Sequence, residues 1–186
     1  MINMSEEIIV RHCSPTLAGM KTGNIFTHSF VNECEMKENI RRWNRILVKK
    51  GLRIIPLRFR EGKALIYVYR PSRLSCDLRD ETACRLLQER GYAVEMPERC
   101  VRKLMQRLGD SEEFPHEIGL FLGYPPEDVC GFIENKADCC KLVGCWKVYG
   151  DVDSAQRLFL KYKKCTAVYC AQLEKGNTIE KLALAL

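Results

Sequence analysis

Residues 52–70 read LRIIPLRFREGKALIYVYR, and this stretch decides the fold. Every second residue from Ile55 to Phe59 is apolar, with Pro56 and Arg58 between them, which is the period of a half-buried strand. Glu61-Gly62-Lys63 supplies a turn, and residues 64–69 are apolar on both faces. The stretch predicts a β-hairpin whose second strand lies inside a sheet and whose first strand lies nearer the edge, where Pro56 is tolerated.

The sequence on either side of the hairpin is mainly helical in pattern. Residues 33–50 carry apolar side chains at three- and four-residue steps, and Gly51 ends that helix. We expect further helices over residues 5–12, 80–90, 97–108, 125–133 and 178–186. Two more helices are expected to begin at Ser14-Pro15 and at Asp151. We expect further strands over residues 24–30, 118–122 and 143–149.

About five strands interleaved with helices predict an α+β or α/β fold, with one mixed sheet covered by helices. The sequence has no internal repeat, low-complexity segment or linker, so we expect a single domain over residues 1–186.

Composition indicates a cytoplasmic globular protein. The 186 residues are 46% hydrophobic and 29% charged, and no run approaches the roughly 18 apolar residues of a membrane span. The first seven residues are polar and acidic, where a signal peptide would be basic and then apolar.

Eleven cysteines are an odd number, and in a reducing cytosol they are buried thiols, metal ligands or redox groups. Four of them would supply enough thiolates for zinc or an iron–sulfur cluster: Cys140, Cys145, Cys165 and Cys170. The spacing disfavours a metal site at these cysteines. Both pairs have four intervening residues, at the upper end of the two to four that structural zinc sites favour. A five-residue step on a helix also leaves the two side chains roughly 140° apart. Both interpretations of these cysteines, as metal ligands and as buried thiols, therefore remain.

His12 and Cys13 precede the helix start expected at Ser14-Pro15. A thiolate beside a helix N-terminus has a lowered pKa, so Cys13 is a candidate nucleophile or redox thiol. His12 or His116 is then the candidate base. The alternative is an exposed histidine and a packed cysteine.

Several other side chains are candidate binding groups. Lys21 and Asn24 in one turn, and Asn135 and Lys136 in another, offer donors to an anionic ligand. Trp146 and Tyr149 would stack on a flavin, or simply pack in the core. The sequence contains neither a phosphate loop at Lys21 nor a dinucleotide fingerprint after any strand.

Positive charge is concentrated around the hairpin. The net charge is +6, and residues 41–73 hold eleven Lys or Arg residues against one acidic residue, Glu61. Such a stretch attracts phosphates, an acidic partner or nucleic acid, or else forms a solvated face.

Three segments resemble the signature stretches of the domain of unknown function 3793 (DUF3793) family of anaerobic Gram-positive bacteria. They are RHCSPTLAG at residues 11–19, FPHEIGLFLGYPPEDV at 114–129 and GCWKVYGD at 144–151. The family has no established activity. The resemblance implies a setting near flavodoxin and iron-related proteins, and hence redox or iron metabolism.

Three classes of function follow. The preferred one is a redox- or iron-linked accessory protein or enzyme with a thiol-based site, whose partner would be an acidic redox protein such as a flavodoxin. The second is a non-catalytic module that binds an acidic protein or nucleic acid through Arg53, Arg58, Arg60 and Arg70, beside Phe59, Tyr67 and Tyr69. The third is a metal-free enzyme for a small ligand, with a pocket built from His12, Lys21, His116 and Lys136.

Overall fold

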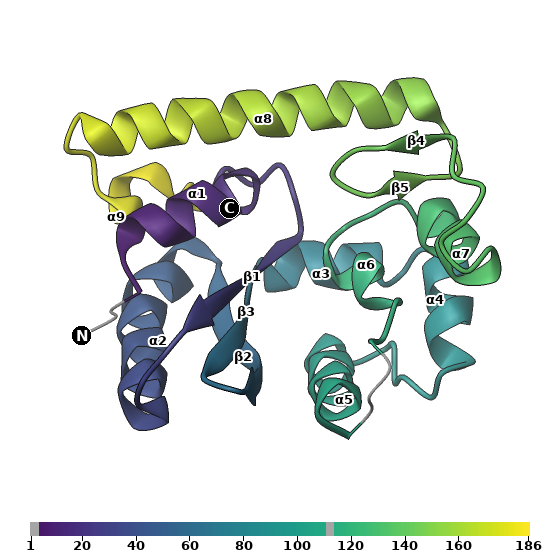
Figure 1. The fold of residues 1–186 in the computed structure, drawn as a ribbon, viewed down its shortest axis with the longest axis horizontal. Coiled ribbons are helices and arrows are strands. Elements are labelled where there is room, and N and C mark those ends of the chain that lie inside the picture. Colours follow the sequence, from purple (N-terminus) through teal and green to yellow (C-terminus); the bar gives the residue numbers. More distant parts are fainter. Residues whose placement is uncertain (1–3, 111–113) are drawn as a thin grey trace. The chain divides into compact units, whose positions relative to one another are not determined.

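The computed structural model describes residues 4–110 and 114–186, so the first three residues of the acidic N-terminal segment lie outside it (Figure 1). The elements of the described residues are, in order, α1 (Glu6–Leu17), β1 (Gly23–Ser29), α2 (Glu33–Leu47), η1 (Val48–Lys50), β2 (Arg53–Arg60), β3 (Lys63–Tyr69), α3 (Pro71–Asp77), α4 (Glu81–Gln88), α5 (Pro97–Asp110), α6 (Ile118–Phe121), α7 (Pro126–Glu134), β4 (Leu142–Val143), β5 (Lys147–Val148), α8 (Val152–Glu174) and α9 (Ile179–Leu182).

The predicted α+β class and the count of five strands are confirmed for the described residues. The strands form two antiparallel sheets, with orders β1-β3-β2 and β4-β5, where the sequence analysis expected one mixed sheet.

The predicted hairpin is confirmed as β2 and β3. The apolar strand β3 lies in the middle of its sheet, between β1 and β2. Pro56 lies on the edge strand, and the register of β2 against β3 shifts between Pro56 and Arg58. An edge strand tolerates a proline because one side of it needs no ladder hydrogen bond.

The chain divides into two compact units. The first unit comprises Met1–Ser72 and Lys164–Leu186, and the second comprises Arg73–Lys163, so the division falls within α8. The expectation of a single domain stays a prediction.

The core of the first unit joins α1, α2 and α9 to the three-stranded sheet. The apolar side of α2 is buried, and its Trp43 donates from Nε1 to the carbonyl of Met4 at 2.9 Å. The Asn44 side chain pairs with both backbone groups of Ile54, at 2.7 and 3.0 Å, which fixes α2 against the edge strand β2.

Arg70, at the end of β3, is fully buried. Its guanidinium donates to the carbonyls of Thr16 and Leu17 at the end of α1, of Lys50 in η1, and of Leu184. A cation is favourable at helix carboxyl ends, where the last carbonyls have no partner within the helix. The prediction that Arg70 belongs to an exposed basic surface was therefore wrong.

The predicted fresh helix start at Ser14-Pro15 was also wrong. Helix α1 begins after Ser5, whose hydroxyl accepts from Ile8, and it continues through Pro15. Proline removes only one donor here, and the residues beyond it bond back: Ala18 to Ser14 at 2.8 Å and Met20 to Pro15 at 2.8 Å.

In the second unit, the strand expected over residues 118–122 is the short helix α6. Periodicity alone does not separate a short apolar run in a strand from one in a buried helix. The strand expected over residues 143–149 is the tight hairpin β4–β5, which turns at residues 144–146. Helix α3 was not predicted. The other expected helices are confirmed as α2, α4, α5, α7, α8 and α9, with shifts of a few residues at their ends.

The buried carboxylate of Asp128 ties α7 to the β4–β5 hairpin. One oxygen accepts from Trp146 Nε1 at 2.7 Å, and the other accepts from the backbone of Tyr149 and of Gly150 at 2.7 Å. Three donors satisfy this charge, as a buried carboxylate requires. Among the described helices, none is both long and apolar enough to cross a membrane.

Candidate anion-binding pocket

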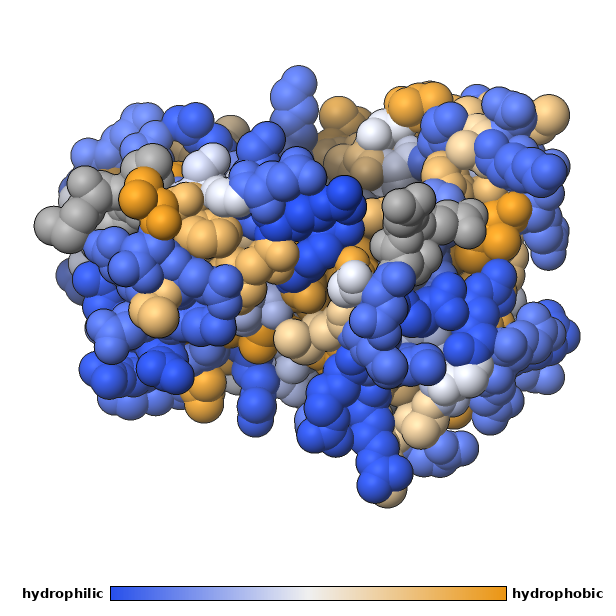
Figure 2. Space-filling view, turned by 60° about the horizontal axis from the view of Figure 1, so that its bottom comes forward, coloured by the Kyte–Doolittle hydropathy of each residue, from blue (hydrophilic) through white to orange (hydrophobic). Residues whose placement is uncertain are grey.

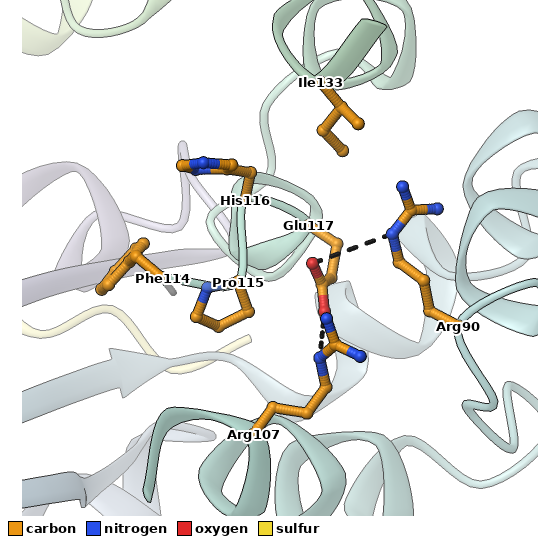
Figure 3. A pocket seen from close by; sticks show the side chains of 7 residues that line it. All are labelled: Arg90, Arg107, Phe114, Pro115, His116, Glu117 and Ile133. Atoms are coloured by element: carbon orange, nitrogen blue, oxygen red, sulfur yellow. Dashed lines mark ion pairs between the residues drawn. The ribbon is translucent and has the colours of Figure 1, made fainter. Parts of the chain in front are cut away.

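A pocket of about 210 Å³ opens in the second unit (Figure 3). Its position follows from three elements: α5 ends just before it, α6 begins beside it, and α7 covers one side. Its lining residues are Arg90, Arg107, Phe114, Pro115, His116, Glu117 and Ile133.

Glu117 organises the pocket. Its carboxylate is only 3% exposed. Oε1 accepts from the hydroxyl of Tyr92 at 2.8 Å and lies 2.8 Å from Nε of Arg107. Oε2 lies 3.9 Å from Nε of Arg90. One buried negative charge therefore holds two guanidinium groups at one place, as Figure 3 shows.

The surroundings of Glu117 shift the pKa of Tyr92. Burial raises the pKa of its phenol well above the usual range, and the hydrogen bond to Glu117 raises it further. Tyr92 therefore stays a neutral donor to Glu117 at all physiological pH values.

The two arginines come from different segments of the second unit. Arg90 follows α4 and also donates from Nη1 to the carbonyl of Leu86 at 3.0 Å. Arg107 lies in the last turn of α5 and is 38% exposed, which leaves part of its guanidinium at the pocket surface.

His116 lies at the pocket, as a candidate base would. Its ring is exposed and makes an edge contact with Phe132, at 5.0 Å between centroids, and a tilted contact with Phe114 at 6.4 Å. Of the residues predicted as catalytic, it is the one that lines this pocket.

The other two predicted catalytic residues lie on α1, in the first unit. His12 is exposed and stacks on Phe26, at 5.1 Å between ring centroids. Cys13 is fully buried in the middle of the helix, and burial raises the pKa of its thiol well above the usual range. The premise of an activated thiolate at a helix N-terminus is therefore wrong for Cys13.

Asn24 and Asn135, two of the four predicted donor groups, make hydrogen bonds within the protein. Lys21 is buried, and Asn24 accepts from the hydroxyl of Thr16 at 2.7 Å. Asn135 donates to the carbonyl of Gly131 at 2.8 Å at the end of α7. Lys136 is exposed and has a positive φ of 49°. The first two belong to the first unit and the last two to the second, and none lines the pocket.

Trp146 and Tyr149 take part in the packing of the second unit. Trp146 is 7% exposed and stacks on Tyr124 at 4.8 Å, with Phe159 edge-on at 4.5 Å. Tyr149 packs against Gly131 of α7. Trp146 is thus a core aromatic, whereas Tyr149 is half-buried.

The four candidate metal ligands divide between the units: Cys140 and Cys145 in the second, Cys165 and Cys170 in the first. Within residues 4–110 and 114–186, no three His, Cys, Asp or Glu side chains are grouped so that they could hold a metal ion. All eleven cysteines lie in these ranges, and all are free thiols.

Arg90, Arg107 and Glu117 were not predicted as site residues from the sequence. Each arginine lies at or just after the end of an amphipathic helix, where a charged side chain is ordinarily expected to be solvated. Glu117 lies beside His116 in the segment 114–129. An acidic residue within such an apolar run was the one feature of the sequence that could have indicated a buried, functional carboxylate.

The fold and the pocket define an α+β protein with an arginine-lined pocket closed by a buried glutamate. The chain belongs to the family of proteins of unknown function DUF3793, whose model matches residues 9–183. No curated protein and no solved structure matches the chain.

Proposed function

We propose that this protein binds a small anionic metabolite, bearing a carboxylate or a phosphate, in the pocket between Arg90, Arg107 and His116. The observation that carries the proposal is the charge balance around Glu117. Two guanidinium groups share one buried carboxylate, so the described lining carries an excess of positive charge.

The chemistry of arginine supports an anionic ligand. The guanidinium presents five donors in a planar fork that matches a carboxylate or phosphate. Arg107 uses Nε toward Glu117, which leaves its two terminal nitrogens for a ligand. Glu117 thus positions Arg107, and Phe114 and Ile133 supply an apolar wall.

The size of the pocket limits the ligand. Sites for drug-sized ligands measure roughly 300–1,000 Å³. At about 210 Å³ this pocket fits a small acid or a phosphate better than a flavin. The proposal retains the cytoplasmic setting predicted from composition, with which eleven free thiols are consistent.

Calorimetric titration with inorganic phosphate and with succinate tests the proposal. We expect saturable binding of at least one of them, weakened at least tenfold by Arg107→Gln, because a hydrogen bond to a charged group contributes about 1.5–3 kcal/mol. Glu117→Gln should also weaken binding, because it releases both guanidinium groups.

The matched control is Arg102→Gln, an exposed arginine on the same helix α5. It removes the same charge and should leave the affinity within twofold of the wild type. Equal affinity in the wild type and the Arg107→Gln variant, or binding of neither anion, would refute the proposal.

A further inference from the structure

The two units differ sharply in charge. The first unit holds 16 of the 30 Lys and Arg residues and 8 of the 24 acidic residues, for a net charge of +8. The second unit holds the remaining 14 basic and 16 acidic residues and is net negative by two. The first unit is therefore the part of the chain whose charge favours the binding of a polyanion.

Within the first unit, α2 and η1 carry a row of cations on the side opposite the core. Arg41, Arg45 and Lys49 are four residues apart and all exposed. Four residues rise about 6 Å along a helix, so the three charges follow one another in a nearly straight line. The buried side of the same helix carries Met36, Ile40, Trp43 and Leu47. We call Arg41, Arg45 and Lys49 the α2 row.

The α2 row is poorly neutralised by its neighbours. The first unit contains the ion pairs Arg11–Glu7, Lys37–Glu33 and Arg60–Glu61. None involves the row. Glu38 is the acidic residue on the same face. Figure 2 shows mostly hydrophilic residues (blue) at the left of the view, where α2 lies.

The surroundings of the row favour a phosphate backbone over a protein. Protein interfaces have an apolar centre with buried anchors. Among the described residues of α2 and η1, Val48 in η1 is the one large apolar side chain that is exposed. Tyr67 and Tyr69 of the hairpin are buried, so they offer no platform for the bases of a single strand. A duplex needs only cations at phosphate spacing.

We propose that the α2 row binds the phosphate backbone of double-stranded nucleic acid, without sequence preference. This inference concerns the first unit and does not depend on the pocket in the second. Each cation contacts one phosphate and releases a counterion, so the affinity falls steeply as salt is added.

Fluorescence anisotropy with a 20-base-pair DNA duplex, an RNA duplex of the same length and polyglutamate tests the proposal between 50 and 200 mM salt. The variant is Arg41→Gln/Arg45→Gln/Lys49→Gln. The control is Lys164→Gln/Lys175→Gln/Lys181→Gln, which removes the same charge from exposed positions elsewhere in the first unit. Circular dichroism checks that both variants keep their helices.

We expect binding of at least one duplex by the wild type, and the row variant should lower the slope of log affinity against log salt by about three, at roughly one per lost phosphate contact. The control should keep the slope. Tighter binding of polyglutamate than of either duplex would assign the row to an acidic protein instead and overturn the proposal. Absence of duplex binding at 50 mM salt, or an unchanged slope in the row variant, would also overturn it.

Discussion

Arg70 donates four charge-assisted hydrogen bonds to backbone carbonyls from a fully buried position. We expect Arg70→Met to lower the free energy of unfolding by at least about 3 kcal/mol, because each hydrogen bond to a charged group contributes about 1.5–3 kcal/mol and the carbonyls lose their partner. Arg70→Lys should recover only part of the loss, because an ammonium lacks the planar fork.

Urea unfolding followed by circular dichroism measures these changes. Arg53→Met is the control, because Arg53 is exposed at the start of the neighbouring strand β2. If Arg70→Met unfolds within about 0.5 kcal/mol of the wild type, as a surface change does, the structural role given to Arg70 is wrong.

Cys13 predicts a dependence of stability on pH. Its thiol has a pKa raised by burial in the folded protein, whereas the unfolded thiol ionises near its ordinary value of 9.0. The stabilisation is therefore complete below pH 9 and is lost as the pH rises above it, by about 1.4 kcal/mol per pH unit for this one group.

Unfolding free energies of the wild type and Cys13→Ala between pH 8 and 10.5 check this expectation. The variant should show a smaller decline above pH 9 whatever its stability at neutral pH. Parallel curves for the two proteins would show that Cys13 ionises equally in the folded and unfolded states.

At the scale of elements, Gly131 shows how closely α7 lies against the residues after β5. A Cβ at Gly131 would stand 2.5 Å from Cγ and 2.6 Å from Cβ of Tyr149, whose backbone is held by Asp128. Gly131→Ala should therefore destabilise the protein by about 1–3 kcal/mol, although alanine favours helices.

Gly109→Ala on α5 is the matched comparison, because a Cβ there meets none of the described atoms within 4 Å. It should stabilise the protein by about 0.5–1 kcal/mol through the unfolded chain and helix propensity. Thermal unfolding of both variants measures the contrast. A stabilising Gly131→Ala would mean that α7 and Tyr149 are further apart.

The elements that the sequence predicted well are those whose pattern is long. The hairpin over residues 52–70 and helix α2 each show several periods of their apolar pattern, and the register shift between Pro56 and Arg58 did not obscure that of the hairpin. Residues 118–122 and 143–149 are too short for a period to decide. The α1 boundary failed for another reason: Ser14-Pro15 is a good helix start locally, but Ser5 caps the helix nine residues earlier.

At the scale of the whole molecule, local patterns predicted the fold class but little of the pocket. Arg90, Arg107 and Glu117 are distant in sequence, and their convergence depends on how α4, α5 and α6 pack. His116 was predicted as a candidate base because it lies next to Glu117, just before the strand expected over residues 118–122. Conversely, Lys21 and Arg70 read as surface cations, yet tertiary structure buries both.

NMR during titration with inorganic phosphate and succinate gives the sharpest test of the anion site in the second unit. We expect saturable shifts of the His116 ring and of the Nε–H signals of Arg90 and Arg107 with at least one of the two anions, and we expect these shifts to be lost in Arg107→Gln. Shifts that never saturate with either anion, or that are confined to the cations of the α2 row in the first unit, would contradict it.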